Sequence, residues 1–144
     1  MLVVDTNVLL YAADQDSEFH LPCRRLLERL RGEPAPVFLT WSICYEFLRV
    51  CTHPRVFRNP WTAAEAWRFI EALLTAPGIS VLRPTDRHAA VLASTVAELA
   101  ELRGNLMHDL HTAVLMREHG VSRICTRDSD FHRFAFLSVV DPLR

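Results

Sequence analysis

The sequence has 144 residues, of which half are hydrophobic and 23% are charged, and its formal net charge is −1. This profile excludes a disordered or fibrous protein and fits one globular domain over residues 1–144, which buries about 68–70% of the surface exposed by the unfolded chain. All 16 basic residues are arginines, so chemistry that needs a lysine, such as the phosphate-binding loop of P-loop enzymes, is excluded.

Short apolar stretches alternate along the chain with longer amphipathic ones. The predicted strands are Leu2–Val4, Val37–Leu39, Ile79–Leu82, Arg123–Thr126 and Leu137–Val140. The predicted helices are Val8–Ala13, a segment with Pro22 in its first turn that stops at Gly32, Ser42–Thr52, a segment from a capping box at Thr62–Glu65 to Pro77, Asp86–Arg103 and Asp109–His119, with a single turn at Asp130–Phe134. This alternation is typical of an α/β sandwich built on a parallel sheet.

No stretch of the sequence predicts attachment to a membrane. The longest uncharged run, Pro34 to Tyr45, is too short to span a bilayer, and Asp5 interrupts the N-terminus before an apolar signal segment could form. We therefore expect a cytoplasmic protein. Its cysteines are scattered without a Cys-x-x-Cys pair, which favours reduced core residues over a structural zinc site: Cys23, Cys44, Cys51 and Cys125.

Several acidic residues follow predicted strands or sit near the start of predicted helices. Functional crevices of parallel sheets lie outside the carboxyl ends of the strands, so these acids are expected to converge at one edge. Asp5 ends the first strand, and Glu46 lies about one turn into the helix after the second, with a side chain that leans back toward the start of that helix. The others are Asp109, which is expected to open its own helix, and Asp128 and Asp130, which come just after the fourth strand.

Each of these acids also has a purely structural interpretation. Asp5 and Asp109 are suitable helix N-caps, and Glu46 with Arg49 could form a surface pair. Asp128 and Asp130 could simply shape a turn. Together, however, these interpretations leave the shared placement unexplained. The remaining helical glutamates are assigned to solvated faces: Glu65, Glu71, Glu98, Glu101 and Glu118.

Clustered carboxylates repel one another unless a cation or a proton lies between them. Mg²⁺ is the first candidate, because it binds carboxylates, water and phosphate oxygens, and Mn²⁺ accepts the same ligands. Such an ion lowers the pKa of bound water and offsets charge on a phosphodiester. The pattern therefore points to hydrolysis of a phosphate ester.

With these residues placed, the sequence resembles PIN-domain ribonucleases of the VapC toxin type over essentially its whole length. The matching stretches are VVDTNVLLYA, Glu46 in YEFLR, THPRVFRNPWTAAEA, RGNLMHDLHTAVLMREHG and TRDSDFHRF. The resemblance implies catalytic acids at Asp5, Glu46, Asp109 and Asp128, metal ligands at Asp5, Asp109, Asp128 and Asp130, and supporting polar groups at Thr6, Asn7 and Thr126.

The resemblance further implies a PIN-like three-layer α/β/α sandwich with a parallel sheet of about five strands in the order 3-2-1-4-5. It implies Mg²⁺- or Mn²⁺-dependent cleavage of RNA, a homodimer, and a VapB-type antitoxin whose C-terminal segment blocks the site. Two alternatives stay open. One is a catalytically silent PIN scaffold that binds RNA or a protein partner, and the other is a phosphatase or phosphoacceptor of another α/β family, which is disfavoured by the missing lysine.

Binding of RNA is less visible than the acidic site, because a dedicated nucleic-acid binder usually has a basic excess. Several arginines could bind backbone phosphate, with surface salt bridges as an equal alternative for each. They are Arg24, Arg25, Arg49, Arg55, Arg58, Arg127 and Arg133.

Overall fold

A computed structural model describes residues 1–99 and 101–144, and at its centre lies a five-stranded parallel sheet. Its strands are β1 (Leu2–Val4), β2 (Val37–Thr40), β3 (Ile79–Leu82), β4 (Arg123–Cys125) and β5 (Ser138–Val140). They follow the order β3-β2-β1-β4-β5, which confirms the expected topology. β1 is central because Val3 and Val4 are apolar and fully buried, as a strand covered on both faces requires.

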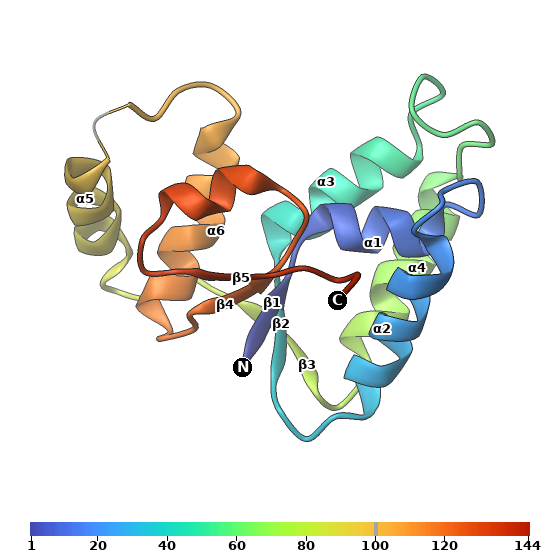
Figure 1. Ribbon diagram of the computed structural model, residues 1–144, viewed down its shortest axis with the longest axis horizontal. Coiled ribbons are helices and arrows are strands. Elements are labelled where there is room, and N and C mark those ends of the chain that lie inside the picture. Colours follow the sequence, from blue (N-terminus) through green and yellow to red (C-terminus); the bar gives the residue numbers. More distant parts are fainter. Residues whose placement is uncertain (100) are drawn as a thin grey trace.

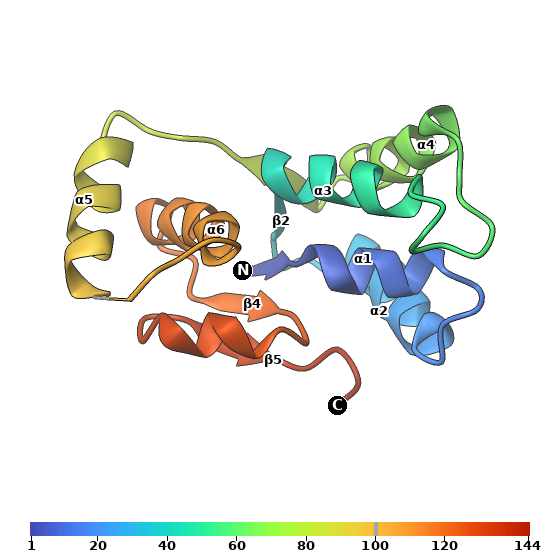
Figure 2. The same ribbon diagram turned by 90° about the horizontal axis from the view of Figure 1, so that it is seen from above.

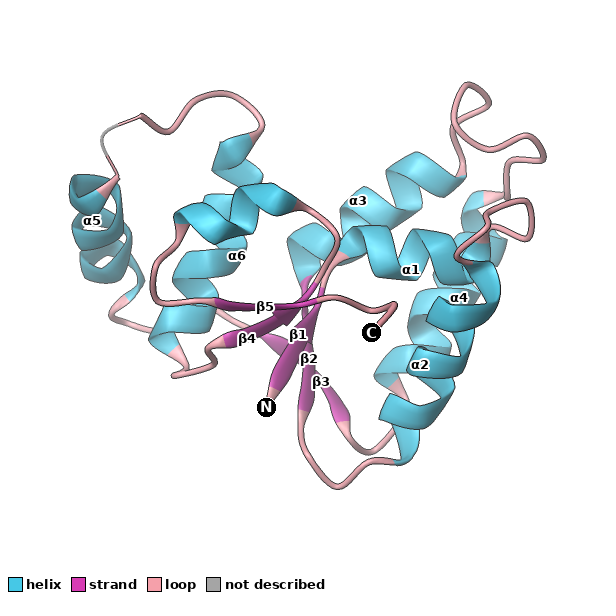
Figure 3. Cartoon of the chain, in the orientation of Figure 1, coloured by secondary structure: helices cyan, strands magenta, loops and turns pink. Residues whose placement is uncertain are grey.

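Helices cover both faces of this sheet. They are α1 (Thr6–Ala13), α2 (His20–Gly32), α3 (Trp41–Cys51), α4 (Ala63–Leu74), α5 (His88–Glu98) and α6 (Leu106–Glu118), followed by the 3-10 helix η1 (Ser129–Arg133). Figures 1 and 3 show α5 and α6 on one side of the sheet and α1, α2 and α4 on the other. In the described ranges, no helix has the length and apolarity needed to cross a membrane.

Local hydrogen bonds explain where the helices begin. The Thr62 hydroxyl accepts from the Glu65 N–H while the Glu65 carboxylate accepts from the Thr62 N–H, so the predicted capping box is confirmed. The Thr40 hydroxyl accepts from the Ile43 N–H and caps α3. The Asp5 carboxylate accepts from the Thr6 N–H at 2.7 Å, so α1 begins at Thr6, two residues earlier than expected.

The core lies between the sheet and the helices that cover it. An aromatic cluster anchors α3 to α4: the rings of Phe47 and Phe69 stack with centroids 4.9 Å apart, and Trp61 meets both edge-on. All four cysteines are free and buried, as expected, and burial raises the pKa of each thiol to between about 11 and about 12. They are therefore protonated and unreactive at neutral pH.

The predicted helix over Asp86–Arg103 was too long at both ends. It begins at His88, because the N–H and the hydroxyl of Thr85 both donate to Glu118 and hold the preceding chain away from a helical path. It ends at Glu98, because Leu99 turns into an extended conformation and packs, with Leu102, against the core. Ala100, inside the predicted helix, lies outside the described residues.

The assignment of Glu118 to a solvated face was wrong. Its side chain is fully buried at the end of α6, where its Oε2 lies 2.6 Å from His88 Nδ1 and its Oε1 accepts from the Thr85 N–H and hydroxyl at 2.9 and 2.7 Å. The Arg87 guanidinium donates to its backbone carbonyl. A single buried carboxylate thus joins the start of α5 to the end of α6.

Glu118→Ala should lower the free energy of unfolding by about 2 kcal/mol, because it leaves partly buried donors of Thr85 and His88 without an acceptor. Urea denaturation measures this loss. Glu71→Ala removes an exposed glutamate of α4 and should leave the midpoint close to that of wild type. Equal midpoints for the two variants would contradict a structural role for Glu118.

Candidate active site

Asp5 is held at the carboxyl end of β1 by a dense set of hydrogen bonds. One carboxylate oxygen accepts from the Thr6 N–H, and the other accepts from the Thr126 hydroxyl at 2.6 Å and from the Asn7 amide at 2.7 Å. The Asp5 side chain is buried, so these donors replace the water that a carboxylate otherwise requires.

The Thr126 hydroxyl connects three segments of the chain. It donates to Asp5 and accepts from the Asn7 amide at 2.8 Å and from the Asp128 N–H at 2.9 Å. Asn7 in turn accepts from the Arg127 N–H through its Oδ1. One buried hydroxyl therefore fixes the end of β1, the first turn of α1 and the chain beyond β4 relative to one another.

Glu46 reaches the same edge from α3. Its Oε2 accepts from the Thr6 hydroxyl at 3.0 Å, which joins α3 to the first residue of α1. Its Oε1 lies 4.0 Å from a guanidinium nitrogen of Arg49, and both side chains are largely exposed. The surface pair that was the structural alternative for Glu46 is therefore present, but it is loose and leaves the carboxylate available to the site.

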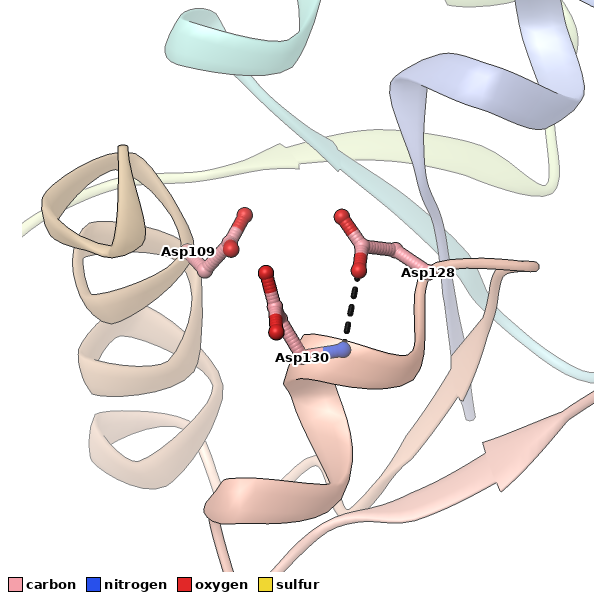
Figure 4. Close-up of side chains that lie close together, drawn as sticks. All are labelled: Asp109, Asp128 and Asp130. Carbon is pink, nitrogen blue, oxygen red and sulfur yellow. Dashed lines mark hydrogen bonds between the residues drawn. The ribbon is translucent and has the colours of Figure 1, made fainter. Parts of the chain in front are cut away.

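Three aspartates form a compact cluster beside Asp5. Oxygens of Asp109, Asp128 and Asp130 all lie within 4.8 Å of one another, and Figure 4 shows the three side chains pointing toward a common centre from α6 and from the chain around η1. The Asp130 N–H donates to Asp128 Oδ1 at 2.8 Å, so Asp128 also caps the short helix η1 and shapes the turn. Asp128 therefore has a structural role and also belongs to the acidic site, as Asp5 does.

One local expectation at the cluster was wrong. Asp109 does not open its helix, because α6 already begins at Leu106 and Asn105 occupies the capping position. Asp109 lies at the end of the first turn instead, and its carboxylate points across the edge of the sheet toward Asp128. Sequence spacing therefore predicted the right neighbourhood for Asp109 but the wrong helix boundary.

The electrostatics of the site show that the acids share one environment. Burial raises the pKa of Asp5 from 3.8 to about 6, although hydrogen bonds from Thr126 and Thr6 oppose the rise. Burial raises the pKa of Asp109 to about 7, and four negative charges add to the rise: Asp128, Asp5, Asp130 and Glu46. Without a cation the cluster therefore favours partial protonation near neutral pH.

A cavity of about 270 Å³ extends from these acids between α3 and α6. Asp5, Glu46 and Asp109 line one part of it, and six further residues line the rest: Ser42, Ile43, Tyr45, Arg49, His108 and Thr112. Among these, only Arg49 was a candidate from the sequence. The missed signal was helical spacing, because Ser42 lies four residues before Glu46, Tyr45 four before Arg49, and Thr112 three after Asp109, so that each pair shares a face of its helix.

The donor set suits a hard divalent cation. Every side-chain ligand in the cluster is a carboxylate oxygen, the preferred partner of Mg²⁺ and Mn²⁺. Burial and then the neighbouring negative charges raise the pKa of Asp109, and a cation would offset that repulsion. The residues present therefore fit such an ion.

A parallel sheet in this order, with acids gathered at its carboxyl edge, defines a PIN-like protein. The model of the PIN domain family matches residues 2–137. VapC ribonuclease Mb2897 of Mycobacterium bovis is 37% identical over 99% of this chain and 96% of its own, and Ribonuclease VapC48 of Mycobacterium tuberculosis is 33% identical over 96% and 94%. The chain belongs to the PIN-domain family, in its VapC branch.

A solved structure supports the fold. VapBC2 from Rickettsia felis, bound to a DNA fragment from its promoter, contains a chain that superposes with a TM-score of 0.69 at 14% identity, over 96% of both chains. At such low identity the likeness concerns the arrangement of helices and strands alone.

In metal-free buffer, the contribution of Asp5 and Asp109 to the stability of the protein should fall as the pH rises from about 4 to about 8. The folded pKa values of Asp5 and Asp109 lie above the unfolded value, so their contribution is full at low pH and is lost as they ionise. Asp109→Asn should therefore be about 1–2 kcal/mol more stable than wild type at pH 8, allowing for solvent screening of a half-buried group, and equal to it at pH 4. Thermal unfolding across this range measures the difference.

Asp16→Asn provides the matched control, because Asp16 is an exposed acid in the turn after α1. Its stability should follow that of wild type at every pH. Added Mg²⁺ should stabilise wild type at pH 8 more than Asp109→Asn. A stability difference between wild type and Asp109→Asn that is the same at pH 4 and pH 8 would contradict the raised pKa of Asp109.

Proposed function

We propose that the protein is a metal-dependent endoribonuclease and the toxin of a type II toxin–antitoxin pair, formed by a single PIN domain over residues 1–144. The observation that carries this proposal is the convergence of five acids at one edge of the sheet: Asp5, Glu46, Asp109, Asp128 and Asp130. Its relatives carry the name ribonuclease, which supports RNA as the substrate. The alternative is a catalytically silent PIN scaffold that binds RNA or a protein partner.

In this proposal Asp5, Asp109, Asp128 and Asp130 hold Mg²⁺ or Mn²⁺. The ion would lower the pKa of water and offset negative charge on the phosphodiester. The Asp5 carboxylate is kept in one orientation by hydrogen bonds from Thr6, Asn7 and Thr126. The Thr6 hydroxyl also donates to Glu46. Supporting groups of this kind typically contribute about 10–100-fold to metal affinity or activity.

Glu46 is the proposed proton acceptor of the site. It lines the cavity beside Asp5, and its carboxylate is held by one hydrogen bond while nearly half of its side chain is exposed. Such a group can take a proton from an attacking water and release it to solvent. Asp5 and Asp109, with raised pKa values, are instead the acids that gain most from a bound cation.

Two protein partners complete the proposal. The similarity to a chain of the VapBC2 pair supports a VapB-type antitoxin whose C-terminal segment lies along the protein and blocks the cavity. A homodimer is supported by α5, whose sequence HAAVLASTVAE is apolar on nearly every side although only Thr95 is buried. Helices of this kind are normally covered, and a second copy would cover α5. Such a protein acts in the cytoplasm, where its RNA substrate is.

Purified protein should cleave total RNA in the presence of Mg²⁺ or Mn²⁺ and stop when EDTA is added. Asp5→Asn should lose well over the ~10–100-fold typical of supporting groups, because it removes a charged ligand of the proposed ion. Gel analysis of RNA fragments measures the rate, and Asp16→Asn should cleave as wild type does. Cleavage that persists in EDTA, or full activity of Asp5→Asn, would remove the nuclease assignment; binding of RNA without cleavage would favour the silent scaffold.

The double substitution Leu92→Glu with Val96→Glu should convert a dimer to a monomer, because it places two charges on exposed apolar positions of α5. Light scattering after gel filtration measures the mass. Leu21→Glu, at an exposed apolar position on α2, should leave the mass unchanged. An unchanged mass for the α5 variant would show that this helix is not the dimer contact.

A further inference from the structure

Three side chains of α3 form an exposed line beside the cavity, which we call the α3 strip: Trp41, Tyr45 and Arg49. They are spaced by four residues and so share one face of the helix, with a rise of ~6 Å from one to the next. Tyr45 is 70% exposed and Trp41 41% exposed, and the Arg49 side chain is also mostly exposed. Two large aromatic rings and one cation thus follow one another along the surface.

The α3 strip is continuous with the acidic site. Tyr45 and Arg49 line the same 270 Å³ cavity as Asp5, Glu46 and Asp109. Figure 2 shows that α3 starts beside α6, which carries Asp109, and runs away from it toward the loop before α4. A chain whose scissile bond lies at the acids can therefore extend along α3.

Packing of the core does not account for the exposed rings. The opposite side of α3 supplies the core contacts, through Phe47, which is fully buried against Phe69 and Trp61. The nearest partner of Arg49 is Glu46 at 4.0 Å, a loose surface contact that adds little to stability. Two rings and one guanidinium are therefore available to a ligand.

The chemistry of the α3 strip matches an unpaired nucleic acid strand. Aromatic rings stack on bases whatever their sequence, and a guanidinium binds backbone phosphate. The net charge of −1 and the acids of the site give little general attraction for RNA, so stacking has to supply much of the binding. Bases in a duplex are paired and stacked on one another, which hides their faces from Trp41 and Tyr45.

Resting on the proposed nuclease function, we propose that the α3 strip selects single-stranded RNA. Bases next to the scissile phosphate stack on Tyr45 and Trp41, and Arg49 binds a flanking phosphate. Tyr45 and Trp41 are positioning residues, because they touch the substrate away from the reacting atoms.

All binding variants carry Asp5→Asn as well, so that the RNA stays intact. Fluorescence anisotropy measures the Kd for one labelled RNA oligonucleotide, either as a single strand or paired in a duplex. Tyr45→Ala and Trp41→Ala should each raise the Kd for the single strand by roughly 5–100-fold, with little change for the duplex. Tyr45→Phe keeps the ring and should bind as the parent does. In the active protein, Tyr45→Ala should raise KM more than it lowers kcat.

Trp67→Ala is the matched control, because Trp67 on α4 is 40% exposed, close to the 41% of Trp41. It should not change the Kd. If Tyr45→Ala and Trp41→Ala bind the single strand as Trp67→Ala does, the α3 strip is not an RNA track. Variants that only dissociate a dimer would likewise overturn the proposal and assign this face to contact between copies.

Failure of this inference is distinguishable from failure of the proposed function. If the wild-type protein cleaves RNA and the variants of the α3 strip bind and cleave it equally well, only the proposed role of the α3 strip is overturned. Wild-type protein that neither cleaves nor binds RNA overturns both.

Discussion

The structure depends on bringing like charges together and holding them there. Asp5, Asp109 and Asp128 repel one another, and burial of Asp5 adds to the cost. The Thr126 hydroxyl opposes this by donating to Asp5 while it accepts from the Asp128 N–H. The central position of β1 assists this, since an inner strand delivers its terminal acid between neighbouring strands on both sides.

Much of this arrangement could be predicted from the sequence, because it follows from chain direction. Apolar runs such as Leu2–Val4 predict buried parallel strands, and parallel strands place whatever follows them at one edge. Asp5, Asp128 and Glu46 needed no more than that rule. The order of the strands came from the resemblance to VapC ribonucleases, since periodicity alone does not rank one strand order above another.

The predictions that were wrong depended on contacts between distant segments. Glu118 looked like a solvated helix residue, but Thr85 and His88, about thirty positions earlier, turn it into a buried acceptor. The same contact shortens α5 at its start. Exposure of Tyr45 was likewise not predictable, because the pattern of α3 does not tell which aromatic residues pack against α4.

The contact between Thr126 and Asp5 spans 121 positions of the chain. A ribosome making this protein therefore releases nearly all of it before the last acids can join the first. Fragments that stop short of Asp130 carry an incomplete set of carboxylates, so the acidic cluster is assembled only in an almost complete chain.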